Sequence, residues 1–337
     1  MNETTPPALL GIDWGTSNRR AWWVSPRGDV LAEHSDDQGL LAMQGRFAES
    51  LQALLPAGPP WREGGTVLMS GMVGAASGWQ EVPYIDAALP LTELARHLQP
   101  VAAAGPRSFI VPGLCFSGAD GTVDVMRGEE TQLLGALALG HGDGWYVLPG
   151  THSKWVRLAD SRVVDLATYM TGELFALLTQ HGTLSSVTRH AVAQAGQATR
   201  SNTQPNAPPN APPNTQQNTQ QNTQESPQAF ARGVTAAARS GLSNALFGCR
   251  AQVVAGRMPA GEAREYLSGL LIGAEWHDVV RRAGQAPHRI TLIGSAQLAA
   301  RYAGVAEAAG CHITTLDARS VQLAAFAALS SRLAAHP

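Results

Sequence analysis

The sequence predicts an α/β protein made of two related units, each opening on a hairpin-rich sheet. The stretches GIDWGTSNRRAWWVSPRGDV (11–30) and VLPGTHSKWVRLADSRVV (147–164) share one order: apolar strand, Gly-Thr turn, basic residue, Trp-Val, polar turn, second strand. Strand and helix patterns also alternate along the chain, which is typical of α/β folds. The length of 337 residues suits about two domains of ordinary size.

The composition favours a soluble globular protein. Hydrophobic residues make up 44%, charged residues 15%, and the net charge of −2 gives no bias toward nucleic acid or anionic membranes. The cysteines Cys115, Cys249 and Cys311 form no CxxC pair, which argues against a zinc site or a disulfide framework and favours a reducing cytosol. No signal peptide and no apolar run of about 20 residues is found. We expect a cytoplasmic protein without nucleic-acid or membrane partners.

The expected elements before residue 200 are mostly strands. Apolar, β-rich runs predict strands at 8–15, 19–24, 29–35, 66–71, 108–113, 145–150, 154–160 and 162–168. Helical periodicity appears at roughly 40–55, 91–98, 128–139 and 171–181. The short turns SPRGD and ADSR predict antiparallel hairpins between the second and third strand of each unit.

A polar repeat interrupts the second unit. Residues 201–228, SNTQPNAPPNAPPNTQQNTQQNTQESPQ, contain no large apolar side chain and are predicted to be disordered, as a tolerated surface loop or as an interaction tract. After it we expect helices near 229–239, 243–255 and 261–284, the strands RITLIG and HITTLD joined by a helix, and a final Ala/Leu-rich helix.

The two Gly-Thr turns are candidate phosphate sites. Glycine permits a tight turn, and free backbone N–H groups beside Thr or Ser hydroxyls can bind phosphate oxygens. Two such turns facing one cleft would hold a polyphosphate from both sides. Asp13, just before the first turn, either orients a hydrated Mg²⁺ or caps the turn. No P-loop or Rossmann fingerprint is present.

Six motifs in order extend this pattern to a family. GIDWGTS, VLPGTHSKW and ITLIGSAQLAARY resemble the phosphate-one, phosphate-two and adenosine motifs of the actin–hexokinase–Hsp70 superfamily. More closely, IDWGTSNRRAW, SGMVGAASGWQEVPY, DVMRGEETQLLGA, LPGTHSKWV, MTGELFALL and YLSGLLIGAE resemble the 2-dehydro-3-deoxygalactonokinase family. The similarity runs from about Leu9 to Leu333, with an insert at 196–228 as the main departure.

This resemblance implies two actin-like (RNase H-like) domains with mixed sheets, flanked by helices, around a central ATP cleft. We expect the domains at 1–140 and 141–337, and leave open whether the final helix near 319–333 returns to the first. The implied reaction is transfer of the γ-phosphoryl group of ATP, with Mg²⁺, to the 6-hydroxyl group of 2-dehydro-3-deoxy-D-galactonate in galactonate catabolism. Alternatives are a kinase for another sugar acid and a non-catalytic sugar-sensing regulator; a homodimer is left open.

The resemblance also suggests roles for single residues. Related sugar kinases carry an Asp, within an Asn-Asp pair, at a helix start roughly 20 residues before the second phosphate turn. Glu129 and Glu130 occupy the corresponding place here, so that Glu replaces the Asp of the family pattern. We favour Glu130 as the general base over Glu129 and Asp124; alternatively, both glutamates only complement the helix dipole. Whether Lys154 faces the cleft or solvent depends on strand alternation. The nucleotide would contact Asp13, Gly15, Thr16, Ser17, Gly150, Thr151, Ser153, Lys154, Gly294 and Ser295, and the sugar acid would contact Asn18, Arg20, Gly71, Met72, Trp79, Gln80, Arg127 and Glu173.

Overall fold

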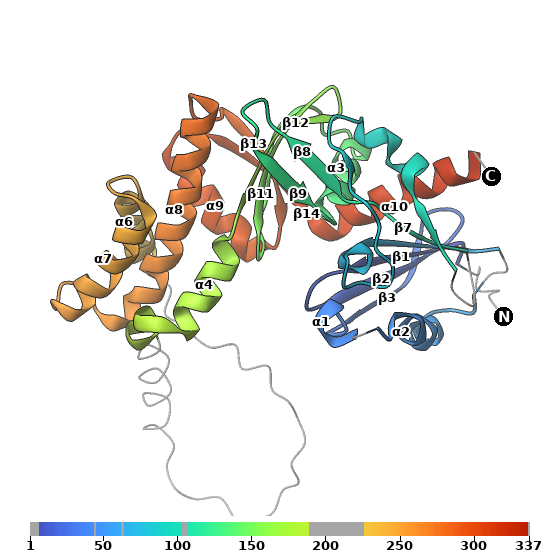
Figure 1. Cartoon of the computed structure of the whole chain (residues 1–337), viewed down its shortest axis with the longest axis horizontal. Helices are drawn as coiled ribbons and strands as arrows, with labels where there is room; N and C mark the ends of the chain where they lie inside the picture. Colours follow the sequence, from blue (N-terminus) through green and yellow to red (C-terminus); the bar gives the residue numbers. More distant parts are fainter. Residues whose placement is uncertain (1–6, 44, 62–63, 103–106, 189–225, 336–337) are drawn as a thin grey trace, which may run out of the picture.

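Two β-sheets that share an order of five strands form the frame of the molecule, as the computed structural model shows (Figure 1). The structure describes residues 7–43, 45–61, 64–102, 107–188 and 226–335. The first sheet has the order β3-β2-β1-β4-β7-β6, and the second has the order β12-β11-β10-β13-β14. In both, three antiparallel strands continue into two parallel ones, and the first sheet adds β6 as a sixth strand antiparallel to β7. This confirms the predicted α/β fold with mixed sheets.

The first sheet grows from the first Gly-Thr hairpin. Its strands are β1 (Leu9–Trp14), β2 (Arg19–Val24), β3 (Val30–Asp36), β4 (Thr66–Gly71), β6 (Gln99–Val101) and β7 (Arg107–Ile110). One face packs against α1 (Leu40–Met43) and α2 (Phe47–Leu54), where strand alternation buries Leu10, Ile12 and Trp14. A predicted single helix at 40–55 is therefore two helices, and Gly45 between them has a φ of 87° that no right-handed helix contains.

The second sheet repeats the arrangement from the second Gly-Thr hairpin. It consists of β10 (Gly144–Leu148), β11 (Ser153–Ala159), β12 (Arg162–Tyr169), β13 (Arg289–Gly294) and β14 (His312–Asp317). The long helix α8 (Ala263–Ala283) and α9 (Ala296–Ala308) cover one face, burying Val147 and Trp155 against Trp276 and Tyr302. In both units, the hairpin that contains the Gly-Thr turn therefore packs one apolar face against helices.

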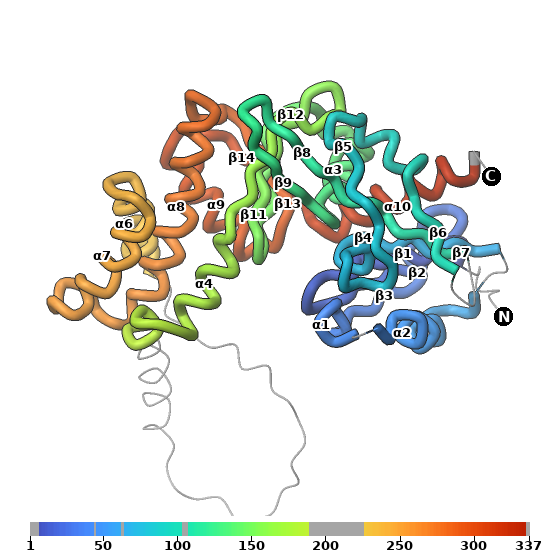
Figure 2. Tube along the Cα trace, viewed as in Figure 1, coloured from blue at the N-terminus to red at the C-terminus, as the bar shows by residue number. Residues whose placement is uncertain are grey.

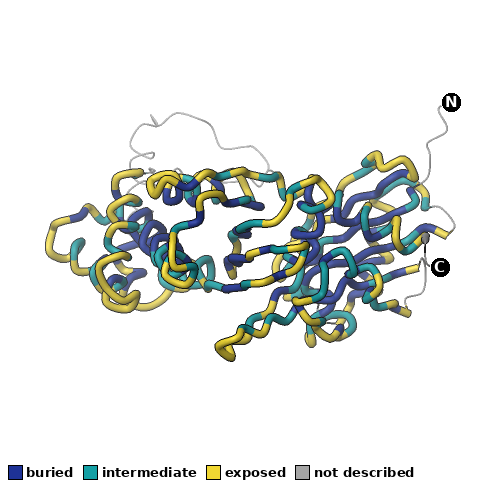
Figure 3. The backbone as a smooth tube through the Cα atoms, turned by 90° about the horizontal axis from the view of Figure 1, so that it is seen from above, coloured by how far each residue is buried: buried dark blue, intermediate teal, exposed yellow. Residues whose placement is uncertain are grey.

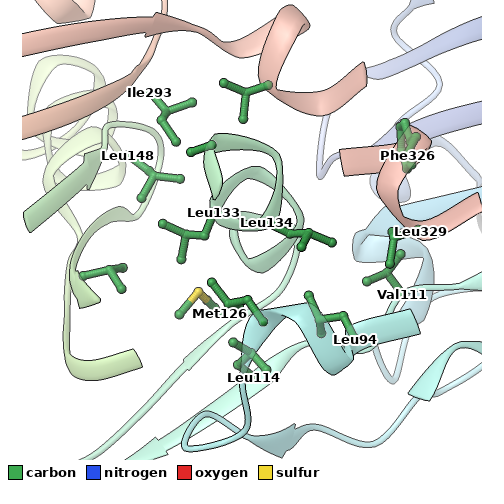
Figure 4. Close-up of a cluster of buried hydrophobic side chains, with 14 of the residues drawn as sticks. Leu94, Val111, Leu114, Met126, Leu133, Leu134, Leu148, Ile293, Phe326 and Leu329 are labelled. Atoms are coloured by element: carbon green, nitrogen blue, oxygen red, sulfur yellow. The ribbon is translucent and has the colours of Figure 1, made fainter. Parts of the chain in front are cut away.

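Helix α3 (Glu129–Ala138) and the final helix of the chain lie between the two sheets (Figure 1). Helix α3 follows the small three-stranded sheet of β5 (Ile85–Asp86), β8 (Leu114–Ser117) and β9 (Val123–Met126). In Figure 4 its Leu133 and Leu134 lie between Leu148 and Ile293 of the second sheet on one side and Phe326 and Leu329 on the other. One continuous hydrophobic core therefore joins the two units.

The final helix α10 (Ala318–Ala335) leaves the second sheet and packs on the first unit (Figure 1). Phe326 contacts the indole of Trp22 at a ring-centroid distance of 6.3 Å, and Gln322 Nε2 donates to Ser70 Oγ at 2.8 Å. A short 3₁₀ segment, Leu91–His97, takes the place of the expected helix at 91–98 and lies against α3 and α10. The division at residues 140 and 141 stays a prediction.

A group of helices extends the second unit away from the first (Figure 2). It comprises α4 (Thr171–Gln180), α6 (Pro227–Ala237), α7 (Leu242–Val254) and α8, around a core that includes Leu184, Ala245, Tyr266 and Leu270. Of the expected insert at 196–228, residues 196–225 lie outside the described residues. Pro227 and Gln228 instead form the first turn of α6, which Ser226 caps by accepting a hydrogen bond from the Ala229 N–H group, so the insert ends earlier than expected.

Burial follows this architecture. Figure 3 shows buried stretches of the chain in the interior and exposed stretches along the outside of the molecule. None of the helices in the described part of the chain is both long and apolar enough to cross a bilayer.

Candidate active site

The first Gly-Thr turn joins β1 and β2 and presents free backbone donors. Gly15 N–H donates to the Asn18 carbonyl at 2.9 Å, which closes the turn. The N–H groups of Thr16, Ser17 and Asn18 make no hydrogen bond to any other described residue, and all three residues are exposed. Unpaired N–H groups in an exposed turn can bind an anion.

Asp13 stands at the end of β1 beside this turn. Its Oδ2 accepts a hydrogen bond from Arg20 Nη2 at 2.8 Å, and the exposed fractions of the two side chains are 16% and 45%. Burial raises the pKa of Asp13, and the charge and hydrogen bond of Arg20 act against that rise. Arg20 is therefore paired with the carboxylate at the first turn.

The second Gly-Thr turn joins β10 and β11 and repeats the free donors. The N–H groups of Gly150, Thr151 and His152 have no hydrogen-bond partner among the described residues, and these residues are exposed. The Thr151 carbonyl accepts from Glu173 N–H at 3.0 Å, and His152 Nε2 lies 2.6 Å from Glu173 Oε2. Glu173, a predicted substrate contact, thus ties the start of α4 to the turn.

Ser153 differs from the expectation that its hydroxyl faces a phosphate. The side chain is fully buried, and Oγ donates to Glu275 Oε1 of α8 at 2.7 Å. Alternation along β11 is the cause: Ser153 and Trp155 point to the α8 face, while Lys154 points to the opposite face and is 6% exposed. Lys154 therefore faces the space between the units rather than solvent.

Two glycines let the start of α3 approach the end of β4. Gly71 has a φ of 88° and Gly128 a φ of 111°, values that favour glycine. A Cβ on Gly128 would lie 3.3 Å from the Gly71 Cα, and one on Gly71 would lie 2.7 Å from the Trp14 carbonyl oxygen. Helix α3 therefore begins beside the strand ends of the first sheet.

Glu130, the favoured base, is sealed inside the protein. Its exposed fraction is 0%, Oε2 accepts from Gly128 N–H at 2.6 Å, and Oε1 accepts from Thr131 Oγ1 at 2.9 Å. Burial, and next the charge of Glu129, raise the pKa of Glu130 to about 8. A side chain without access to solvent or ligand is poorly suited to accept a substrate proton.

Glu129 is the partly exposed member of the pair. Its Oε2 accepts from Arg127 N–H at 3.1 Å. Burial raises the pKa of Glu129, the charge of Lys154 opposes that rise, and the charge of Asp13 adds to it. Glu129 therefore lies within electrostatic range of groups that flank both turns.

Asp124, the third predicted base, joins the two units. Its Oδ2 accepts from Thr168 N–H and its Oδ1 from Thr168 Oγ1, both at 2.7 Å. Lys154 Nζ donates to the same Thr168 Oγ1 at 2.9 Å. Because both carboxylate oxygens bind β12, Asp124 is a structural link between β9 and the second sheet.

A cavity of about 270 Å³ lies beside the second turn. Its walls come from the turn, α4, α8 and α9: Pro149, Gly150, Thr171, Gly172, Phe175, Arg264, Glu265, Ser268, Leu271, Ile272, Gln297, Leu298, Arg301 and Tyr302. Gly294 and Ser295, predicted adenosine contacts, stand at the entry to α9, where Ser295 Oγ accepts from Leu298 N–H at 3.4 Å. The cavity wall continues from them along α9.

An ion pair forms part of that wall. Arg301 binds Glu265 through two hydrogen bonds of 2.9 Å each, and its Nη1 also donates to Ser268 Oγ at 3.0 Å. Sequence reasoning missed Arg264, Gln297 and Arg301, although all three lie on the helices that follow or face the Gly-Ser junction. The signal was the helical spacing of polar residues after Gly294.

Part of the predicted sugar-binding loop after β4 packs against the core of the first unit. Trp79 stacks on Phe47 at a centroid distance of 6.4 Å, and Gln80 Nε2 donates to the Pro100 carbonyl at 3.4 Å. Met72 is partly buried in the 3₁₀ turn that follows Gly71. These residues shape the loop, and their contact with a sugar stays a prediction.

Arg127 contacts this loop from the other side. Its Nη2 donates to the Val82 carbonyl at 2.7 Å, and its guanidinium lies 4.3 Å from the centre of the Tyr84 ring. Nε and Nη1 are buried and have no partner among the described residues. Unpaired buried donors are costly, so such a group indicates a missing acceptor.

Asp13 is the carboxylate beside the first turn that could hold Mg²⁺. No cluster of three or more His, Cys, Asp or Glu side chains suited to a metal is found in the described ranges. Mg²⁺ keeps several waters and is held through one or two carboxylates plus substrate phosphates, so a single partly exposed Asp13 beside a turn with unpaired N–H groups fits the ion.

The sequence model of the 2-keto-3-deoxy-galactonokinase family matches residues 13–329, which include both turns, Glu129 and the cavity. The chain belongs to the 2-keto-3-deoxy-galactonokinase family. It is 34% identical over 317 residues to the 2-dehydro-3-deoxygalactonokinase of Escherichia coli (strain K12), covering 91% of this chain and 92% of that protein. A Rhizobium meliloti (strain 1021) protein with the same activity in its name is 35% identical over 324 residues, covering 94% of each chain.

A solved structure agrees with this family membership. The crystal structure of a Sinorhizobium meliloti protein, described as a candidate 2-dehydro-3-deoxygalactonokinase, superposes with a TM-score of 0.79. The two chains are 32% identical, and the superposition covers 96% of each. As a member of a kinase family, the chain is a phosphotransferase that uses ATP and an alcohol acceptor.

Proposed function

We propose that this family member transfers the γ-phosphoryl group of ATP to the 6-hydroxyl group of 2-dehydro-3-deoxy-D-galactonate, as in galactonate catabolism. The family match over residues 13–329 carries the proposal, because it includes both turns, the start of α3 and the walls of the cavity. The hydroxyl oxygen would form a bond to the γ-phosphorus while the bridging P–O bond to the β-phosphate breaks, which releases ADP.

The two turns are proposed to bind the phosphates. Three unpaired N–H groups in each turn support this role, since such groups match anionic oxygens without any further charge. The adenosine would occupy the cavity beside the second turn, between α4, α8 and α9. Gly150 and Thr151 therefore stay proposed nucleotide contacts, whereas Ser153 would support the turn through its hydrogen bond to Glu275.

Asp13 is proposed to hold Mg²⁺ through water. When bound, the ion supplies neutralising charge to the phosphate oxygens. Arg20 keeps the Asp13 carboxylate oriented by its hydrogen bond of 2.8 Å, and its guanidinium adds positive charge at the first turn.

Glu129 is proposed as the general base in place of Glu130. Its partial exposure and its position near Asp13 and Lys154 support this assignment, whereas Glu130 is covered on all sides. Glu129 would take the proton from the 6-hydroxyl group. A raised pKa makes its carboxylate a stronger base than an ordinary glutamate.

Arg127 is proposed to recognise the substrate carboxylate. Its two unpaired buried nitrogens support this, because a guanidinium matches a carboxylate better than any other side chain does. The loop of residues 72–84 covers the guanidinium, so we propose that this loop opens to admit the sugar acid. A cytoplasmic location is also proposed, supported by three cysteines that are all free.

A substrate panel tests the function. The purified chain with Mg²⁺ and ATP is given 2-dehydro-3-deoxy-D-galactonate, its gluconate epimer and unmodified galactonate, and ADP release is coupled to NADH oxidation. We expect release that depends on the galactonate derivative, with a 6-phosphate product identified by ³¹P NMR. Absence of acid-dependent ADP release across the panel would exclude the kinase function. Faster turnover of the gluconate epimer would show that the epimer, rather than the galactonate derivative, is the preferred substrate.

A further inference from the structure

A carboxylate beneath the second turn accepts hydrogen bonds from three other elements, β11, α4 and α9. Glu275 of α8 is 2% exposed. Its Oε1 accepts from Ser153 Oγ at 2.7 Å and from Trp155 Nε1 of β11. Its Oε2 accepts from Thr171 Oγ1 of α4 at 2.6 Å and from the Tyr302 hydroxyl of α9 at 2.9 Å.

Neutral donors, rather than a cation, satisfy this group. No ion pair to Glu275 is found within the described residues. Burial raises the pKa of Glu275, and the four hydrogen bonds act against that rise. A buried carboxyl group is tolerated only when its oxygens are hydrogen-bonded, so the four donors are held in place as strictly as the carboxyl group itself.

The same elements form the nucleotide cavity. Thr171 and Tyr302 line it directly, and Gly150 of the second turn lies three residues before Ser153. Leu271 and Ile272 line it from α8, one turn before Glu275, which itself does not reach the cavity. Each wall therefore has a hydrogen bond to one shared carboxyl group behind it.

We propose that Glu275 is a positioning residue for nucleotide binding. It fixes the second turn, the start of α4 and helix α9 at the spacing that the nucleotide needs, without touching the nucleotide. This inference rests on the proposed ATP-binding role of the cavity. Because Glu275 acts through Ser153, Thr171 and Tyr302, weakening any of these bonds should loosen the same site.

The chain offers a matched control for the test. The Tyr169 hydroxyl donates to Asp278 Oδ2, also on α8, at 2.6 Å, and neither residue lines the cavity. Tyr302→Phe and Tyr169→Phe therefore each remove one tyrosine hydroxyl from a carboxylate of the same helix. Thr171→Val removes a second donor to Glu275, and Thr171→Ser keeps it.

The dissociation constant of ADP is measured by titration calorimetry on the full chain with Mg²⁺ and without sugar acid, together with KM for each substrate and the thermal midpoint. Because each change removes or weakens a hydrogen bond in the network around the Glu275 carboxyl group, we expect Glu275→Gln, Tyr302→Phe and Thr171→Val to weaken ADP binding roughly fivefold or more. KM for ATP should rise in parallel and KM for the sugar acid should stay within about twofold. Tyr169→Phe should bind ADP like the wild type, and Thr171→Ser, which keeps the hydroxyl donor to Glu275, should bind ADP more tightly than Thr171→Val.

Coupling separates positioning from direct contact. The double variant Glu275→Gln/Tyr302→Phe should bind ADP within about twofold of Glu275→Gln alone, because both changes act on one network. Fully additive losses would mean that Tyr302 contacts the nucleotide itself and would overturn the proposal. So would variants that lower the thermal midpoint but leave ADP affinity unchanged. If Glu275→Gln does not fold, Tyr302→Phe and Thr171→Val decide. Wild-type ADP binding without sugar-acid turnover would refute the kinase function and leave this inference intact.

Discussion

The two units contribute different surfaces to the site although their sheets share the same order of five strands. On the first side, Asp13 and Glu129 are partly exposed, and Arg127 has two nitrogens without a partner among the described residues. On the second side, Ser153 and Glu275 are buried and hydrogen-bonded to each other. The repeated fold therefore carries polar groups that still lack hydrogen-bond partners in the first unit, and a buried, fully hydrogen-bonded network in the second unit.

This difference suggests a division of labour. Groups with incompletely satisfied charges can change partners during a reaction, whereas a satisfied buried network can only hold a shape. We therefore expect changes on the first side to alter kcat or sugar-acid binding, and changes on the second side to alter nucleotide affinity. The following experiments test that separation, from the largest expected effect to the smallest.

Glu129→Gln should remove the proposed base. Because general-base catalysis contributes about 10²–10⁴-fold, we expect kcat to fall by that factor in the coupled assay while KM for ATP changes little. In the wild type, activity should fall as the pH falls through the raised pKa of Glu129, because the protonated carboxyl group cannot accept the hydroxyl proton.

Glu130→Gln is the matched control for this variant. The same change one residue further along α3 should leave kcat within about fivefold of the wild type, because the side chain is buried and largely neutral at pH 7 with a pKa of about 8. An inactive Glu130→Gln beside an active Glu129→Gln would return the role to Glu130.

Arg127→Met should weaken recognition of the acidic substrate. Loss of a hydrogen bond to a charged group, about 1.5–3 kcal/mol, corresponds to roughly a 10- to 100-fold rise in KM for the sugar acid. KM for ATP should not change. If Arg20→Met raises KM for the sugar acid and Arg127→Met does not, the carboxylate contact belongs to Arg20.

Glu130 should also set a pH dependence of stability. The folded state raises its pKa from 4.5 to about 8, so it favours the protonated form, and this contribution is present below the unfolded value and lost as the pH rises toward the folded one. The difference in unfolding free energy between wild type and Glu130→Gln should therefore fall by about 1.4 kcal/mol per pH unit between these values. Urea denaturation of both proteins at several pH values measures it; a constant difference would show that Glu130 titrates normally.

Local signals in the sequence predicted the frame of this site. The two Gly-Thr hairpins predicted the repeated sheet, and the six ordered motifs predicted the family. Both depend on residues close together in the chain, where strand alternation and turn chemistry act directly. The position of Lys154 facing inward follows from the same alternation, once the register of β11 is known.

Contacts between distant residues could not be predicted in this way. Ser153 and Glu275 are 122 residues apart, and only the packing of α8 on the second sheet brings them together. The choice between Glu129 and Glu130 depends on a helix start at which adjacent side chains point about 100° apart, after a glycine with positive φ. If α3 began one residue earlier or later, Glu129 and Glu130 would exchange their buried and accessible positions.

Helix α10 has a consequence for biosynthesis. Its Val321, Phe326 and Leu329 share a core with Leu9 and Trp22 of the first two strands. During translation, β1 and β2 leave the ribosome roughly 300 residues before the helix that covers them, at about 5–20 residues per second. The face of the first sheet that α10 covers therefore stays uncovered until α10 itself has been synthesised, so the first unit cannot complete its core before most of the second unit has been made.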